Sequence, residues 1–157
     1  MKNILLILLV SGYLSLQAQP AKVIAVYSGS IILAAAGDAL NNSHEKGWGH
    51  LCNAASAGLL VVSPFIIKYE KSKWLYYLAT YTSLRIAMFD CSYNTTRGLP
   101  LNYVGTTSTW DKVQKKNPVD PIISKSVFLS LGIAIPLYKL NGDEKTSHRF
   151  KDQNVIH

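Results

Sequence analysis

Residues 23–37 read VIAVYSGSIILAAAG, an uncharged stretch that mixes small residues with bulky apolar ones. A helix of a water-soluble bundle carries charged residues on the face that it turns to solvent, and this stretch has none. In lipid, helices associate through close backbone packing, which small residues such as Ser28, Gly29 and Ala34 allow. The stretch therefore predicts a buried, membrane-embedded helix.

Three further apolar stretches follow it. They are residues 51–67 (LCNAASAGLLVVSPFII), residues 74–89 (WLYYLATYTSLRIAMF) and residues 126–138 (SVFLSLGIAIPLY). A spanning helix needs about 17–25 apolar residues, and all four stretches lie at or below the lower limit. The charged content of only 16% nevertheless suits a polytopic membrane protein better than a soluble one. We expect an all-α fold, a compact bundle of about four short membrane-embedded helices.

The chain begins with MKNILLILLVSGYLSLQAQ, which has the charged start, the apolar core and the small residue near a cleavage point that are typical of a signal peptide. Because the apolar core is short for a spanning helix, we expect a cleaved leader over residues 1–19, with an uncleaved anchor helix as the alternative. The rest divides into a helical membrane domain, residues 20–140, and a polar C-terminal tail, residues 141–157.

The net charge of +7 comes from basic residues in loops and in the tail, not from one basic face. This distribution favours membrane lipids with anionic headgroups, and not nucleic acid, as partners. We expect a cell-envelope protein, placed in a bacterial inner membrane. Its orientation stays open, because the leader places the loops at residues 38–50 and 90–121 in the cytoplasm, whereas the excess of Lys and Arg lies on the other side.

Two cysteines, Cys52 and Cys91, are the only ones in the chain. They form no CxxC motif and no Cys/His zinc spacing, so neither a metal nor another cofactor is expected. Both fall near the same end of their predicted helices, which makes a disulfide sterically conceivable. Two small buried thiols are the simpler interpretation.

An up-and-down arrangement gathers polar side chains at one end of the bundle. The candidate site residues in this cluster are Asp38, Asn41, His50, Asn53, Arg85, Asp90, Asn94 and Arg97. Arg85 stands out because it lies about one turn from the end of an otherwise apolar stretch, on one helix face with Tyr81 and Phe89. A charge within the membrane must find a partner or reach water.

Two interpretations of Arg85 compete. In the structural one, its guanidinium holds helices together through an ion pair with Asp38 or, at a poorer helical spacing, with Asp90. In the functional one, Arg85 and Arg97 present forked donors to a phosphate or carboxylate group. We expect the ion pair with Asp38.

A catalytic interpretation of the same cluster is also open. His50 would be a general base whose ring is oriented by Asp38 or Asp90, or the three would be metal ligands around an open position. No HExxH or similar spacing supports a metal site, so none is predicted. For His50, a histidine that begins a helix and bonds to a nearby loop is the simpler interpretation.

The segment from residue 94 to residue 116 carries turn residues and its own apolar side chains. Those side chains are Leu99, Leu101, Tyr103 and Trp110. The sequence STWD at residues 108–111 resembles a capping box, which predicts a short helix through about Lys116. We expect the segment to fold over the polar ends of the first three helices, with Asn94, Arg97 and Asp111 contributing to any site.

Two classes of function follow. The first is a small polytopic envelope protein whose polar end binds a lipid headgroup, a small anion or a partner protein. The alternative is a membrane-embedded hydrolase or transferase that acts on a polar lipid headgroup, with catalytic candidates His50, Asp38 and Asp90. Convergence of these three around a pocket favours the enzyme, whereas an Arg85 fully paired with a carboxylate and without a cavity favours a structural role.

Overall fold

The computed structural model describes residues 19–43, 45–105, 109–116 and 118–140. Within these ranges every regular element is helical. The elements are α2 (Gln19–Asn42), α3 (Lys46–Ile66), the 3-10 turn η1 (Lys71–Lys73), α4 (Trp74–Thr96), α5 (Thr109–Lys116) and α6 (Pro121–Lys139). The predicted all-α bundle with a short helix before the last long one is confirmed. Residues 1–18 of the predicted signal peptide and the tail at residues 141–157 lie outside the described residues.

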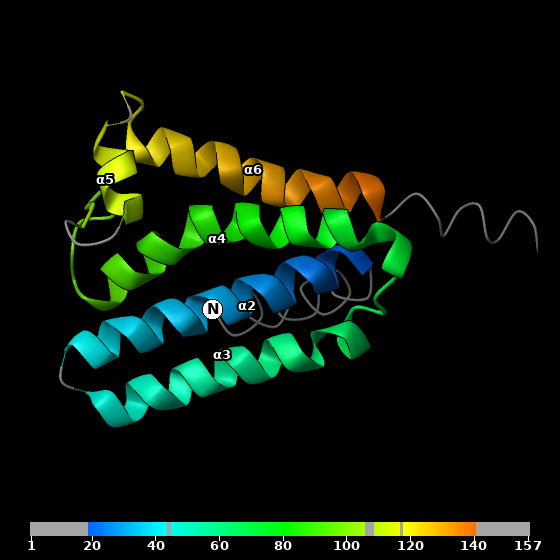
Figure 1. Cartoon of the computed structure of the whole chain (residues 1–157), viewed down its shortest axis with the longest axis horizontal. Helices are drawn as coiled ribbons and strands as arrows, with labels where there is room; N and C mark the ends of the chain where they lie inside the picture. Colours follow the sequence, from blue (N-terminus) through cyan, green and yellow to red (C-terminus); the bar gives the residue numbers. More distant parts are fainter. Residues whose placement is uncertain (1–18, 44, 106–108, 117, 141–157) are drawn as a thin grey trace, which may run out of the picture.

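The four long helices lie side by side in the order α6, α4, α2, α3 (Figure 1). α2 and α4 are central and run in the same direction, because α3 returns the chain between them. The ends of α2 and α4 and the starts of α3 and α6 therefore meet at one end of the bundle, together with α5. We call this end the polar end; it lies at the left in Figure 1.

A stripe of apolar residues on α2 forms the centre of the core. Its members recur every four residues and are all buried: Val23, Tyr27, Ile31, Ala35 and Ala39. The spacing puts them on one helix face. Leu84 of α4 is fully buried and packs closely on Gly132 of α6, where an added Cβ would lie 2.7 Å from a Leu84 methyl carbon. Close approach at a glycine lets the α4–α6 interface bury a large side chain.

Small residues bring α2 and α3 together, as the sequence predicts. The hydroxyls of Ser30 and Ser56 lie 3.0 Å apart, and Ser56 Oγ also donates to the Ser30 carbonyl at 2.8 Å. Nearer the polar end, a Cβ at Gly37 would overlap the Asn53 side chain. The pair is held by van der Waals packing and polar bonds that do not depend on water, which suits a bundle in lipid.

Three helices of the described chain, α2, α3 and α6, are long and apolar enough to cross a membrane. The two outer ones, α3 and α6, turn apolar side chains away from the bundle: Val61 is 73% exposed and Phe65 86% exposed. Exposed apolar surface on this scale is a poor match for water and a good match for lipid. The more polar α4 lies between α2 and α6.

Candidate functional site

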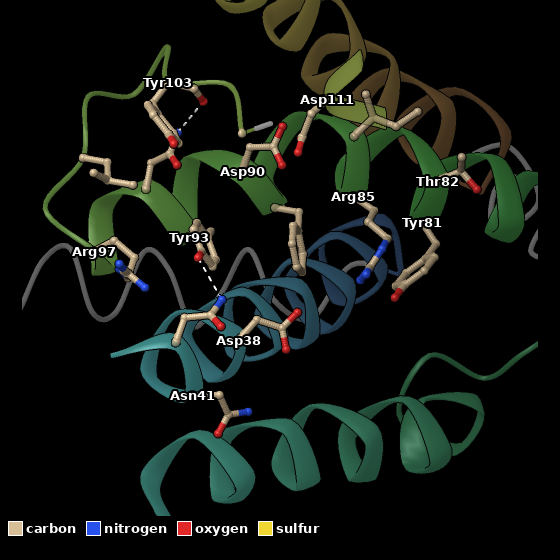
Figure 2. Close-up of a pocket in the computed structure, with 16 residues that line it drawn as sticks. Asp38, Asn41, Tyr81, Thr82, Arg85, Asp90, Tyr93, Arg97, Tyr103 and Asp111 are labelled. Atoms are coloured by element: carbon tan, nitrogen blue, oxygen red, sulfur yellow. Dashed lines mark hydrogen bonds between the residues drawn. The ribbon is translucent and has the colours of Figure 1, made fainter. Parts of the chain in front are cut away.

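A cavity of about 840 Å³ lies between α2 and α4 at the polar end, beneath the segment that leads to α5 (Figure 2). Its polar and charged lining residues are Asp38, Asn41, Asn42, Thr82, Arg85, Asp90, Asn94, Arg97 and Asp111. Five of the predicted binding residues reach this cavity: Asn41, Arg85, Asn94, Arg97 and Asp111. Two of the catalytic candidates, Asp38 and Asp90, line it as well. The size lies within the range of ligand sites.

One stripe of α4 forms the length of the cavity wall. Its members recur every four residues: Tyr81, Arg85, Phe89, Tyr93 and Arg97. The twelve residues that separate the two arginines correspond to about 18 Å along a helix axis, and Figure 2 shows Arg85 and Arg97 at opposite ends of the cavity. The two guanidinium groups are therefore too far apart to hold one phosphate together, which corrects the predicted joint anion site.

Arg85 lies in the middle of α4, as the twelfth of its 23 residues, and not one turn from its end. The helix continues through Thr96, but its last turns are polar, so the apolar pattern stops at Phe89. The packing of Leu84 on Gly132 places Arg85 about level with the middle of α6 as well. The Arg85 backbone is thus about 16 Å from the polar end of its helix, at 1.5 Å per residue.

The predicted ion pair of Arg85 with Asp38 or Asp90 is wrong. Arg85 forms no ion pair within the described part of the chain, and its guanidinium lies over the Phe89 ring, 4.5 Å from the centroid. Both carboxylates have other neighbours: Asn53 Nδ2 donates to Asp38 Oδ1 at 3.1 Å. Asp38 also lies about one turn nearer the polar end, since Asn42, one turn further on, bonds to Tyr93 at 2.9 Å.

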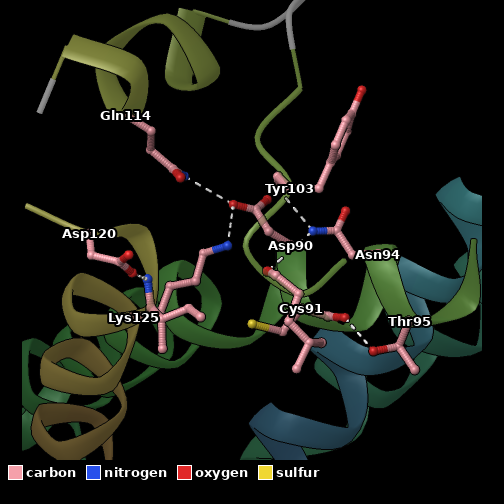
Figure 3. A network of polar contacts seen from close by, with 10 residues as sticks. Asp90, Cys91, Asn94, Thr95, Tyr103, Gln114, Asp120 and Lys125 are labelled. Carbon is pink, nitrogen blue, oxygen red and sulfur yellow. Dashed lines mark hydrogen bonds and ion pairs between the residues drawn. The ribbon is translucent and has the colours of Figure 1, made fainter. Parts of the chain in front are cut away.

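Asp90 is paired with a residue that the sequence analysis did not single out. Lys125 Nζ lies 3.4 Å from Asp90 Oδ2, and Gln114 Nε2 donates to the same oxygen at 3.0 Å (Figure 3). The Lys125 side chain is only 7% exposed. This network joins α4, α5 and α6, and it neutralises the Asp90 charge. The sequence does offer one indication of this pair, because Lys125 directly precedes the fourth apolar stretch.

Asn94 anchors the segment that follows α4. Its amide is buried at 2% exposure and donates to the Tyr103 carbonyl at 2.9 Å and to the Leu101 carbonyl at 3.4 Å. The segment does fold back, as expected, but it covers the end of α4, with α3 on the far side of α2 (Figure 1). Asn94 lines the cavity as expected, but its amide donors are used by the segment itself.

The catalytic arrangement does not form. His50 is exposed on α3 and is not among the residues that line the cavity, whereas Asp38 and Asp90 are. Asn53 also lies outside the lining and acts through its bond to Asp38. Among the described residues, no three His, Cys, Asp or Glu side chains gather as a metal site would require. Cys52 and Cys91 are both free thiols.

Comparison with known proteins finds no matching protein-family model, no matching curated protein and no matching solved structure. The cavity is the feature of the described residues that bears on function. Its described walls offer a guanidinium without a carboxylate partner at one end, Arg97 at the other, an exposed carboxylate on Asp38 between them, and aromatic rings along α4 (Figure 2). These groups can bind an ionic ligand that also has apolar surface.

Proposed function

We propose that this chain is a small membrane protein of the cell envelope whose cavity binds the anionic group of a lipid headgroup, with Arg85 as its main contact. The observation that carries the proposal is the place of Arg85: mid-helix, in a cavity of about 840 Å³, with no ion pair among the described residues. In a bundle that spans a membrane, this level lies well away from the polar end, and the exposed Arg85 side chain faces the cavity instead of a protein carboxylate.

An arginine at such a level is expensive without a counter-charge. Insertion scales put the cost of a central charge at about 2.5–3.5 kcal/mol, whereas a cation–π contact such as that with Phe89 offsets about 0.5–2 kcal/mol. A bound anion supplies the missing stabilisation. Phosphate suits the position because a guanidinium donates two parallel hydrogen bonds to its oxygens.

The rest of the cavity favours a ligand that is polar at one part and apolar at another. Phe89 and Leu99 supply apolar lining, and Tyr81 and Tyr93 supply rings with hydroxyl groups. The outer helices α3 and α6 expose apolar side chains to the surroundings from which a lipid would come. A small inorganic anion would use Arg85 but leave the aromatic wall without a role.

The hydrolase or transferase alternative has less support. It needs a base beside the ligand, and His50 lies outside the cavity. Asp90 is held by Lys125 and Gln114. Asp38 is the catalytic candidate that remains in the cavity, and no histidine is among the lining residues to act with it. Binding is therefore the function that the geometry supports best.

The test is lipid binding by the full chain in a mild detergent. We expect Arg85→Gln to weaken binding of a phospholipid about 10–100-fold, the loss expected for a charged hydrogen bond of about 1.5–3 kcal/mol. Lys46→Gln is the matched control, because it removes one exposed positive charge at the same end but outside the cavity. Equal affinities for the two variants, with both folded by circular dichroism, would contradict the proposal.

A further inference from the structure

We infer that the ligand carries a primary ammonium group beside its anionic group, so that the site takes a zwitterionic headgroup of the phosphoethanolamine class. This inference rests on the proposed function, because it leaves the anionic group with Arg85. It adds a second contact, from the carboxylate of Asp38, and it assigns a chemical class that a general anion site would not select.

Among the carboxylates that line the cavity, Asp38 is the one best placed to bind a ligand. It is exposed, it points into the cavity in Figure 2, and its Oδ1 atom accepts a hydrogen bond from the neutral amide of Asn53 at 3.1 Å. It forms no ion pair within the described ranges of the chain. Asn53 holds one oxygen in place, and the other remains available to accept a hydrogen bond.

The other two acids of the cavity are placed differently. Asp90 shares one oxygen with Lys125 and Gln114 (Figure 3), so its charge is already balanced. Asp111 lies against the backbone at Gly105, where an added Cβ would fall 2.5 Å from its Oδ2 atom. A cationic group that enters the cavity therefore meets Asp38 as its natural partner.

The offset between Arg85 and Asp38 along the helix axes suits a short ligand with opposite charges at its two ends. The Asn42–Tyr93 hydrogen bond sets the register of the two parallel helices. Asp38 lies one turn before Asn42 and Arg85 two turns before Tyr93, so their backbone positions differ by about one turn, or about 6 Å, along the axis. The two side chains face the same cavity without touching each other, which leaves room for a ligand with opposite charges at its two ends.

The lining around Asp38 favours a primary ammonium over a quaternary one. A primary ammonium has three N–H donors, which suit the Asp38 carboxylate and hydroxyl acceptors such as Tyr93 Oη. A trimethylated ammonium has no donor and binds in a cage of several aromatic faces, with no need for a carboxylate. Here an aromatic wall occupies one side and a carboxylate with amides the other. Phosphoethanolamine matches this asymmetry.

The experiment compares phosphatidylethanolamine, phosphatidylglycerol and phosphatidylcholine with identical acyl chains, each titrated onto the detergent-purified full chain. We expect the wild type to bind phosphatidylethanolamine about tenfold more tightly than the other two, the effect of about 1.4 kcal/mol from one charged contact. Asp38→Asn removes this preference, because the ammonium contact is lost and the repulsion of an anionic headgroup is relieved. Glu45→Gln, which neutralises an exposed carboxylate outside the cavity, keeps the preference.

The outcomes separate this inference from the proposed function. Equal binding of the three lipids, with Arg85→Gln still weakening all of them, overturns the ammonium contact and leaves the anion site intact. Binding that is insensitive to Arg85→Gln overturns both. Free phosphoethanolamine distinguishes the sources of the headgroup: competition with the lipid supports a water-soluble occupant, and selectivity without competition supports the lipid-linked form.

Discussion

Lys125 Nζ lies 3.4 Å from Asp90 Oδ2, in the wall between the large cavity and a second cavity of about 210 Å³. The Asp90 carboxylate balances the charge of Lys125. The buried Lys125 ammonium donates no hydrogen bond within the described residues. Gln114 bonds to the same carboxylate oxygen at 3.0 Å. Through this single carboxylate, α6 and α5 are both attached to α4.

Removal of the lysine should strand the carboxylate. We expect Lys125→Met, which keeps the length of the side chain, to destabilise the bundle by about 2–3 kcal/mol. This is below the 3–5 kcal/mol of a fully buried pair because the Asp90 side chain is 26% exposed. Denaturant unfolding in detergent measures the loss. The double variant Lys125→Met with Asp90→Asn should recover most of it, and a double variant as unstable as the single one would show that the charge pair is not the cause.

Gly37 lies where α2 and α3 approach closely, whereas Gly58 faces outward with open space around it. Gly37→Ala places a methyl group on the Asn53 side chain and should cost about 1–3 kcal/mol, the range for overpacking. Gly58→Ala should be neutral or stabilising by up to about 1 kcal/mol, the difference in helix propensity. Thermal unfolding of both variants tests the contrast, and a stabilised Gly37→Ala would contradict the α2–α3 packing.

The two loop carbonyls that Asn94 holds make it the anchor of the cavity roof. Asn94→Ala leaves both carbonyls without this donor, so we expect trypsin under native conditions to cleave faster at Lys112 while the long helices persist. Asn102→Ala, at an exposed position of the same segment, is the control. Similar cleavage rates for the two variants would mean that the segment is held elsewhere.

The long helices were predictable because uncharged apolar runs have few alternatives to burial in a helix. The short helix was predictable too: α5 ends at Lys116, where the capping pattern placed its end. The ends of the long helices were not predictable, because the apolar pattern marks only the part of a helix that contacts apolar surroundings. For this reason Arg85 appeared to lie near a helix end, when α4 continues for eleven residues beyond it.

The partners of the charged residues could not be read from the sequence. The up-and-down order of helices places Asp38, Arg85 and Asp90 on one side, but it does not say which helix packs next to α4. Because α6 packs there, Lys125 reaches Asp90 and leaves Arg85 without a carboxylate. The spacing of Tyr81, Arg85 and Phe89 did indicate the α4 face that lines the cavity.

The most direct test of the central claim is whether the Arg85 guanidinium contacts a phosphate. The chain, labelled with nitrogen-15 arginine, is frozen in a phosphorus-free detergent with one equivalent of phosphatidylethanolamine, and solid-state NMR measures phosphorus–nitrogen dipolar coupling. We predict a coupling in the wild type that persists in Arg97→Lys and disappears in Arg85→Lys, where the labelled group is lost but the charge is kept. A coupling that survives Arg85→Lys, or that is absent from the wild type with lipid bound, would contradict the account.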